Sequence, residues 1–446
     1  MNAKRLIAVI LVLILIVSMM VGCSSKNVSE KKDDVATPSD SSNEKTVITV
    51  WSGYPLADSW YQKMIDEFTA ENPQYDIQLS SFPINDYETK MVAALGSNSA
   101  ADILAMAKPS FLHAFTAAGK FAAMPQHLQD HVKNDGVYNP SVIEEASYNG
   151  EVTSMPHIES VAAFFYNKDY FAEAGLTSVP TSMEELIEYA QELTVYDDSG
   201  NVERSGLSMR LTGGASGTTE KFWVMLMQYG GCLLEEVEDG KYVAGYNNQA
   251  GFDTLSMYLD GLYKYKFDDI NILHDLQALQ AGDTAIFQRE PWAVIDMFNN
   301  APDMNYGTFP LFNAQIGISE NTFVVDNGDQ AVIDGAWKFI EYTIQPENMV
   351  QFLELTGYRP ARLDLDLTKV YETYPQFEAF YKPFDEVQTY QPIDEFQEIM
   401  VSLANRLMEA FKDESMCGNA DKIWAFLEEA ANETNALLQA NGHYGG

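Results

Sequence analysis

The fold is decided near residue 46, in the run Thr46-Val47-Ile48-Thr49-Val50-Trp51. These apolar and β-branched residues predict a buried strand. The turn Ser52-Gly53-Tyr54-Pro55 follows. A helix is expected next, because apolar residues then recur on one helical face, at Trp60, Tyr61, Met64, Ile65 and Phe68. Asn72-Pro73 is expected to end this helix.

The same alternation continues downstream. Tyr75, Ile77 and Leu79 predict a second strand, and Asp102 to Met106 predict a third. Between them, a helix is expected from the spacing of Tyr87, Met91, Val92 and Leu95. Strand–helix–strand–helix–strand is typical of a parallel α/β sheet, which binds ligands beyond the carboxyl ends of its strands. This rule points to residues 51–54, 82–85 and 108–111.

The α/β pattern resumes after residue 160. Strands are expected over 161–166 and 285–287, and a helix is indicated by Leu186, Ile187, Ala190 and Leu193. A further helix is expected to start at Gln345-Pro346 and to end at Gly357. From residue 394 to residue 438 the periodicity is helical, so a helical C-terminus is predicted.

The N-terminus has the form of a bacterial lipoprotein signal. Lys4 and Arg5 precede an apolar run from Leu6 to Val17, and Met20-Val21-Gly22-Cys23 resembles a lipobox. We therefore predict a signal peptide over residues 1–22, lipidation of Cys23 and a flexible polar tether over residues 23–45. A stop-transfer anchor is the alternative. The lipoprotein interpretation places the chain on the extracytoplasmic face of the cell membrane.

Charge and cysteine content narrow the classes of partner. The net charge is −38, which argues against nucleic acid and anionic headgroups as partners. If Cys23 is lipidated, Cys232 and Cys417 remain, either as two thiols or as one disulfide. Four cysteine ligands for a structural metal are not available.

Catalytic and metal-binding motifs are weak. The chain lacks Gly-x-Ser-x-Gly, His-Glu-x-x-His, Walker A and Gly-x-Gly-x-x-Gly patterns. His127 and His131 are four residues apart, but no third ligand is evident. Asp197 to Asn201 is better explained as a turn than as a calcium loop. We predict no catalytic residue, no cofactor and no metal site.

Several stretches together resemble one family. Tyr166-Asn167-Lys168-Asp169 is followed by Phe171 and then by Ala174-Gly175-Leu176. Other matching stretches, in family order, are Ala101-Asp102-Ile103-Leu104, Met155-Pro156, Ala285-Ile286, Pro291-Trp292, Ala336-Trp337-Lys338-Phe339-Ile340 and Gly357-Tyr358. In these stretches the chain is similar to extracellular solute-binding proteins of bacterial ABC importers, of the maltose-binding and glycerol-3-phosphate-binding type.

The resemblance implies a type II, maltose-binding-like fold, in which two α/β lobes are joined by three crossovers and hold the solute between them. By analogy, the N-terminal lobe takes residues 46–158 and 291–345. The C-terminal lobe takes residues 161–290 and 346–446. A solute that contacts both lobes favours the closed form.

The implied function is that of a monomeric receptor, which captures a sugar or oligosaccharide and delivers it to the permease subunits of an ABC transporter. A receptor for glycerol phosphates is one alternative. The others are a polysaccharide-active enzyme and a sensory or adhesive lipoprotein with the same fold.

Sugar binding needs flat apolar rings for the C–H faces and polar groups for the hydroxyls. The resemblance favours Trp292 as a stacking platform, because the aromatic residue of the family's Pro-Trp stretch often stacks on the ligand. Candidate ligand-binding residues occur at strand ends, crossovers and lobe junctions: Trp51, Tyr54, Asn85, Ser110, His157, Glu159, Trp223, Trp292, Tyr358 and Arg359.

Overall fold

The computed structural model describes residues 45–212, 216–273 and 275–446. The predicted signal peptide, Cys23 and almost all of the predicted tether lie outside the described residues. The side chain of Asn85 also lies outside them. Residues 45–446 form one compact unit.

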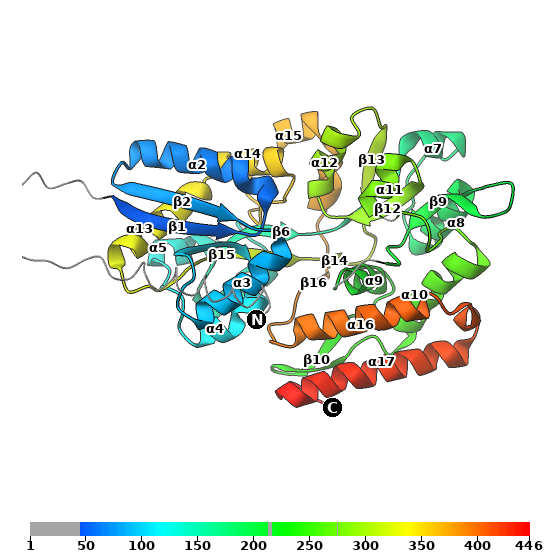
Figure 1. Cartoon of the computed structure of the whole chain (residues 1–446). Helices are drawn as coiled ribbons and strands as arrows, with labels where there is room; N and C mark the ends of the chain where they lie inside the picture. Colours follow the sequence, from blue (N-terminus) through cyan, green and yellow to red (C-terminus); the bar gives the residue numbers. More distant parts are fainter. Residues whose placement is uncertain (1–44, 213–215, 274) are drawn as a thin grey trace, which may run out of the picture. The chain divides into compact units, whose positions relative to one another are not determined.

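The first sheet begins with the strand that the sequence predicts. β1 (Thr46–Ser52) pairs in parallel with β2 (Tyr75–Ser81) and with β3 (Ile103–Ala107). β15 (Ile318–Val324) then runs antiparallel to β3 and to β6 (Met155–Ser160), so the order is β2-β1-β3-β15-β6 (Figure 1). The predicted parallel α/β start is therefore confirmed, with two antiparallel strands added to it.

Helices cover both faces of this sheet. α2 (Asp58–Glu71) buries the expected face through Trp60, Tyr61, Met64, Ile65 and Phe68. Further helices and a short hairpin belong to the same part of the chain: α3 (Ile84–Gly96), α4 (Pro109–Ala117), α5 (Gln126–Val132), α6 (Pro140–Glu145), β4 (Ser147–Tyr148), β5 (Glu151–Val152) and α13 (Gln330–Thr343). The connection that leaves β3 at its carboxyl end carries Ser110 and His113, which line the cavity described below.

The second sheet has the order β13-β7-β12-β9-β8. Its strands are β7 (Ala163–Asn167), β8 (Val195–Tyr196), β9 (Val202–Ser208), β12 (Thr284–Arg289) and β13 (Tyr306–Pro310). Helices and a hairpin accompany it: α8 (Met183–Leu193), α9 (Gly217–Gln228), β10 (Leu234–Glu238), β11 (Lys241–Ala244), α10 (Gln249–Leu259), α11 (Asp275–Ala281), α12 (Trp292–Asn300), α16 (Phe396–Ala410) and α17 (Ala420–Asn441). The predicted helical C-terminus is α16 and α17.

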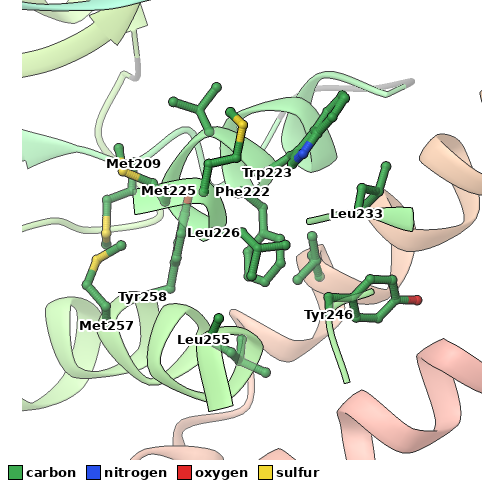
Figure 2. Packing of buried hydrophobic residues seen from close by; sticks show 14 of the residues in the cluster. Met209, Phe222, Trp223, Met225, Leu226, Leu233, Tyr246, Leu255, Met257 and Tyr258 are labelled. Atoms are coloured by element: carbon green, nitrogen blue, oxygen red, sulfur yellow. The ribbon is translucent and has the colours of Figure 1, made fainter. Parts of the chain in front are cut away.

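Helix α9 is the centre of the second hydrophobic core. Nearly all of its residues are buried, because α10 and α16 both pack against it. Figure 2 shows Phe222, Met225 and Leu226 of α9 among side chains of α10, including Leu255 and Tyr258. A helix that is apolar on most of its surface is expected in such an enclosed place.

The chain passes between the two sheets three times within residues 45–446, at 160–163, 310–318 and 357–368. We call these three segments the crossovers. Gln315 ties the first two together, since its side-chain amide accepts from Ala162 N and donates to Ala162 O, each at 2.9 Å. β14 (Gln315–Ile316) also pairs in parallel with β16 (Val387–Gln388).

Two parts of the expected lobe division are wrong. Residues 291–345 were assigned to the N-terminal lobe, yet β13 (Tyr306–Pro310) pairs with β7 in the second sheet, so the chain returns to the first sheet only with β15. Residues 346–446 were assigned to the other lobe, yet α14 (Pro346–Thr356) packs on α2, where Trp60 Nε1 donates to Asn348 O at 3.0 Å. The burial of apolar side chains decides where β13 and α14 lie, and short sequence motifs do not reveal which surfaces are buried together.

Two other features concern the described residues only. Cys232 and Cys417 are both free thiols and form no disulfide with each other. No helix among these residues combines the length and the apolar character that crossing a membrane requires.

Candidate functional site

A cavity of about 560 Å³ lies between the two lobes, each of which is built around one of the two sheets. From the first lobe it is lined by α4, α6 and the hairpin β4–β5, and from the second by α9, the hairpin β10–β11 and residues 387–392. Its size falls within the range of roughly 300–1,000 Å³ that small-molecule sites occupy. The lining side chains that matter below are Ser110, His113, Glu144, Glu145, Tyr148, Trp223, Glu236, Asp239, Gln388, Thr389 and Tyr390.

Ser110 is placed in the cavity by the end of β3. Pro109 starts α4 immediately after that strand, so Ser110 lies in the first turn of the helix. Two residues nearby have special geometry: Met106 has φ of 52°, and the β15 ladder is irregular between Asn321 and Phe323. Bulges and left-handed residues of this kind redirect a strand end, and they are common beside binding sites.

Unpaired polar atoms face this region. Ser110 is 8% exposed, and its Oγ has no hydrogen-bond partner among the described residues. Thr389 Oγ1 and Glu145 Oε1 are also buried and have no hydrogen-bond partner among the described residues. Buried polar groups are normally satisfied, so a cluster of unpaired ones at a cavity is the arrangement expected where a polar ligand binds.

Aromatic rings form the other part of the lining. Trp223 is 2% exposed, and its Nε1 donates to Gln388 Oε1 at 2.6 Å. Its ring stacks on Tyr390, with centroids 6.1 Å apart at 27°. Tyr148 is partly exposed and, among the described residues, meets one other ring, that of His113, edge-on at 5.7 Å. Rings beside unpaired hydroxyls suit a ligand with both apolar and hydroxyl-bearing faces.

A charged cluster joins the two lobes next to the cavity. Lys108 Nζ lies 3.3 Å from Glu88 Oε1 and 5.6 Å from the centre of the Tyr390 ring. Burial alone would lower the pKa of Lys108, but the carboxylates of Glu88, Glu320 and Glu220 raise it above its usual value. Tyr390 in turn donates to Glu220 Oε2 at 3.2 Å. Lys108 therefore stays a cation and is already neutralised by carboxylates.

Trp292 lies beside a second charged cluster and is not part of the cavity lining. Its Nε1 is 3.3 Å from Glu290 Oε2, and the Arg289 guanidinium lies 5.0 Å from the centre of its ring. Glu290 also pairs with Lys221. Burial opposes the ionisation of Glu290, but Lys221 and Arg289 overcome that effect and hold the pKa of its carboxyl below the usual value. A stacking role for Trp292 stays a prediction.

Glu159 and Arg359, two further candidates, are paired with each other. The ion pair is buried, with Glu159 1% and Arg359 6% exposed. Asn139 Nδ2 donates to both carboxylate oxygens of Glu159, at 2.8 and 2.9 Å, and the Arg359 guanidinium lies 4.7 Å from the centre of the Tyr381 ring. A Cβ atom on Gly317 would come within 3.0 Å of Glu159 Oε1. The pair thus lies where all three crossovers meet.

The expectation that His157 faces the cleft is wrong. Its ring is 1% exposed and is enclosed by Trp60 at 5.5 Å and Phe352 at 5.0 Å, edge to face. Neither ring nitrogen has a hydrogen-bond partner among the described residues. Burial lowers the pKa of His157 to about 3, so the ring is neutral at physiological pH and fills the first core.

This burial predicts a pH dependence of stability. Well above pH 6.5 neither the folded nor the unfolded state protonates His157. As pH falls from 6.5 towards 3, only the unfolded chain takes up this proton, so the free energy of unfolding falls by about 1.4 kcal/mol per pH unit from this group. His157→Gln should make this decline in the free energy of unfolding shallower. Urea titrations at several pH values between 6.5 and 4 measure it. His127→Gln, at a histidine with a 61% exposed side chain, is the control. An unaltered decline in His157→Gln would contradict this account.

The remaining candidates lie around the carboxyl ends of the first sheet. Tyr54 and Tyr358 meet edge-on at 5.2 Å. Burial, and then the charge of Glu320, raises the pKa of Tyr54 well above its usual value, and burial raises the pKa of Glu320 to about 7. Trp51 lies under Lys90 Nζ, 4.4 Å from its ring centre, in a separate surface pocket. Of the ten candidates, Ser110 and Trp223 line the cavity.

Sequence reasoning missed Tyr148, His113, Thr389 and Tyr390. Tyr148 precedes the turn Asn149-Gly150, and Tyr390 follows a two-residue strand, so neither stands at the end of a recognisable long strand. His113 is one turn beyond Pro109 on α4, and that spacing was the one available signal.

Residues 63–379 match the family model described as bacterial extracellular solute-binding protein. The match covers well over half of the chain. The chain belongs to this family.

Relatives of this solute-binding protein are distant in sequence. It is 23% identical over 343 residues to the sn-glycerol-3-phosphate-binding periplasmic protein of Escherichia coli K12. The aligned region covers 69% of this chain and 72% of the relative. Among solved structures, it resembles a Listeria monocytogenes ABC substrate-binding protein in complex with cycloalternan, with a TM-score of 0.72, 18% identity and coverage of 88% and 99%. It also resembles a Thermotoga lettingae ABC transporter solute-binding protein bound to α-D-tagatose. The TM-score is 0.71, the sequence identity is 20%, and the match covers 88% of this chain and 100% of the other.

These findings confirm the predicted family and the maltose-binding-like fold. Membership also places this solute-binding protein on the extracytoplasmic side of the membrane. No group of three or more metal-ligating side chains occurs in the part of the chain that the structure describes. His127 pairs instead with Glu341, at 3.3 Å.

Proposed function

We propose that this solute-binding protein is the receptor of an ABC importer and that it captures a sugar or oligosaccharide in the cavity between its two sheets. The observation that carries the proposal is the lining of that cavity, where aromatic rings and unpaired hydroxyl groups from both lobes meet. Rings offer apolar faces to the C–H surface of a sugar, and Ser110 and Thr389 offer partners for its hydroxyl groups.

The corrected lobe division explains how capture is coupled to delivery. Ser110 and Tyr148 belong to the first lobe, whereas Trp223 and Tyr390 belong to the second. A solute held by both sets binds the closed form more tightly than the open one and shifts the population towards it. The permease subunits then receive a closed, loaded and monomeric receptor.

A receptor for glycerol phosphates is the second candidate, because one relative carries that name. A thermal-shift screen of mono- and oligosaccharides together with glycerol phosphates separates the two. A solute present at a hundred times its Kd should stabilise the folded state by about 2.7 kcal/mol. Bound glycan recovered intact after prolonged incubation supports a receptor, and cleaved glycan would support an enzyme instead.

The lipid anchor has its own prediction. Cys23 follows the lipobox-like Met20-Val21-Gly22, so Cys23→Ala should remove the acyl chains. Two acyl chains hold a protein stably on a membrane, since each buried methylene contributes about 0.8 kcal/mol. The variant should therefore leave the membrane fraction or accumulate as an unprocessed precursor. Cys417→Ala is the matched control and should fractionate like the wild type. Normal processing and retention of Cys23→Ala would disprove the anchor.

A further inference from the structure

The cavity has a charge pattern that narrows the class of solute. Its lining holds three exposed carboxylates and a fourth, partly buried acid, Glu145, whose pKa burial raises well above its usual value; among the described residues it holds no lysine or arginine. The four are Glu144, Glu145, Glu236 and Asp239. Three of them, Glu144, Glu236 and Asp239, are exposed, whereas Ser110, Trp223 and Tyr390 are buried. The exposed part of the lining is thus acidic, and its buried part is formed by hydroxyl groups and rings.

Lys108 does not alter this pattern. It precedes Pro109 at the start of α4, and its Nζ is held by Glu88 at 3.3 Å and lies over the Phe111 and Tyr390 rings. A second acidic partner, Glu220, is bonded to the Tyr390 hydroxyl. A phosphate at the cavity would therefore compete with carboxylates for Lys108. It would also lie among carboxylates, and like charges in a partly desolvated site repel one another.

Proteins that bind phosphate present arginine forks, lysine or clustered backbone N–H groups. The lining has neither an arginine nor a lysine among the described residues. Apart from the first turn of α4, it offers the unpaired and nine-tenths buried hydroxyl of Ser110 together with the Thr389 hydroxyl. These groups exchange hydrogen bonds with sugar hydroxyls without any change in charge.

We propose that the cavity selects an uncharged glycan and rejects phosphate-bearing solutes, and that Tyr148 is its accessible stacking surface. This inference rests on the proposed receptor function. Tyr148 is partly exposed, lines the cavity and belongs to none of the hydrophobic cores, whereas Trp223 and Tyr390 are part of the second core. The ring of Tyr148 is therefore free to serve a ligand without disturbing the fold.

Isothermal titration calorimetry on the purified protein tests the selectivity. The uncharged probes are glucose, tagatose, maltotriose and mannotriose. Glucose 6-phosphate and glycerol 3-phosphate are the anions, and spermidine is the cation. At least one uncharged sugar should bind, and the charged probes should give no binding heat at millimolar concentration. Tighter binding of either phosphate, or of spermidine, than of every uncharged sugar overturns the inference and leaves intact only the proposal that the protein is the receptor of an importer. Absence of binding by every probe contradicts both.

Charge reversal tests the cause of the selectivity. The double variant Glu236→Lys with Asp239→Lys should gain about tenfold or more in affinity for glucose 6-phosphate, because two exposed repulsive charges become attractive. Its affinity for the uncharged sugar should change far less than its affinity for glucose 6-phosphate. Unchanged rejection of glucose 6-phosphate would show that these carboxylates do not set the selectivity.

Tyr148 is tested by truncation. Tyr148→Ala should weaken binding of the uncharged sugar by about tenfold or more, and Tyr148→Phe should keep most of the affinity because the ring remains. Tyr196→Ala removes a tyrosine that is 44% exposed on β8, outside the cavity, and is the matched control. Normal affinity in Tyr148→Ala, with the melting temperature of the wild type, would exclude Tyr148 as the stacking surface.

Discussion

Replacing Arg359 by alanine should lower the free energy of unfolding by about 3–5 kcal/mol, because the change leaves the Glu159 carboxylate buried without its cation. Among the described residues, Asn139 would then remain as the side-chain partner of that carboxylate. The loss of the contact with the Tyr381 ring adds to the effect. Urea denaturation followed by circular dichroism measures the change.

An exposed ion pair provides the control for this prediction. Glu173→Ala removes the partner of Arg204, but the Glu173 side chain is 65% exposed, so its loss should cost only about 0–1 kcal/mol. The double variant Glu159→Gln with Arg359→Met should recover part of the stability that Arg359→Ala loses, since neither charge remains buried. Equal stability losses in Arg359→Ala and Glu173→Ala would contradict the idea that the buried pair holds the crossovers together.

Trp223→Ala should be almost as damaging, with a loss of about 3–5 kcal/mol in the free energy of unfolding. The indole is 2% exposed, stacks on Tyr390 and donates to Gln388, so its removal opens a hole in the second core and takes this donor away from Gln388 Oε1. Figure 2 shows the ring beside Phe222 on α9. The same variant should also bind the solute poorly, because Trp223 lines the cavity.

Trp292→Ala is the matched tryptophan variant. Its indole is partly exposed and is held by Glu290 and Arg289 at the start of α12, so truncation should cost clearly less stability than Trp223→Ala. If Trp292 is the platform that the family resemblance predicts, affinity should fall about tenfold or more while the melting temperature changes little. Similar stability losses in the two variants would show that the two indoles are not placed as the structure has them.

Local sequence patterns predicted the individual elements well. The apolar face of α2 is the set of residues that the spacing indicated, and Gly357, with φ of 75°, ends α14 as expected. The start of α8 is likewise set by adjacent residues. Ser182 caps the helix by accepting from Glu185 N, and Thr181 bonds the Glu185 carboxylate. Helix ends and strand runs depend on nearest neighbours, which a sequence displays directly.

The assignment of elements to lobes could not be predicted in the same way. β13 joins the second sheet because it pairs with β7, and α14 joins the first because it packs on α2, and both contacts span more than a hundred residues. The same reasoning explains the candidate site. Ser110 was found because it follows a strand end, whereas His157 is enclosed by α2 and α14, two elements distant from it along the chain.

The most direct test of the central claim is a crystal structure of the protein with the tightest-binding uncharged sugar of the panel. The account predicts a sugar in the cavity between the two sheets, in contact with Ser110 and Tyr148 on one side and with Trp223 or Tyr390 on the other. A sugar bound elsewhere, for example in the surface pocket formed by Trp51 and Lys90, would contradict it.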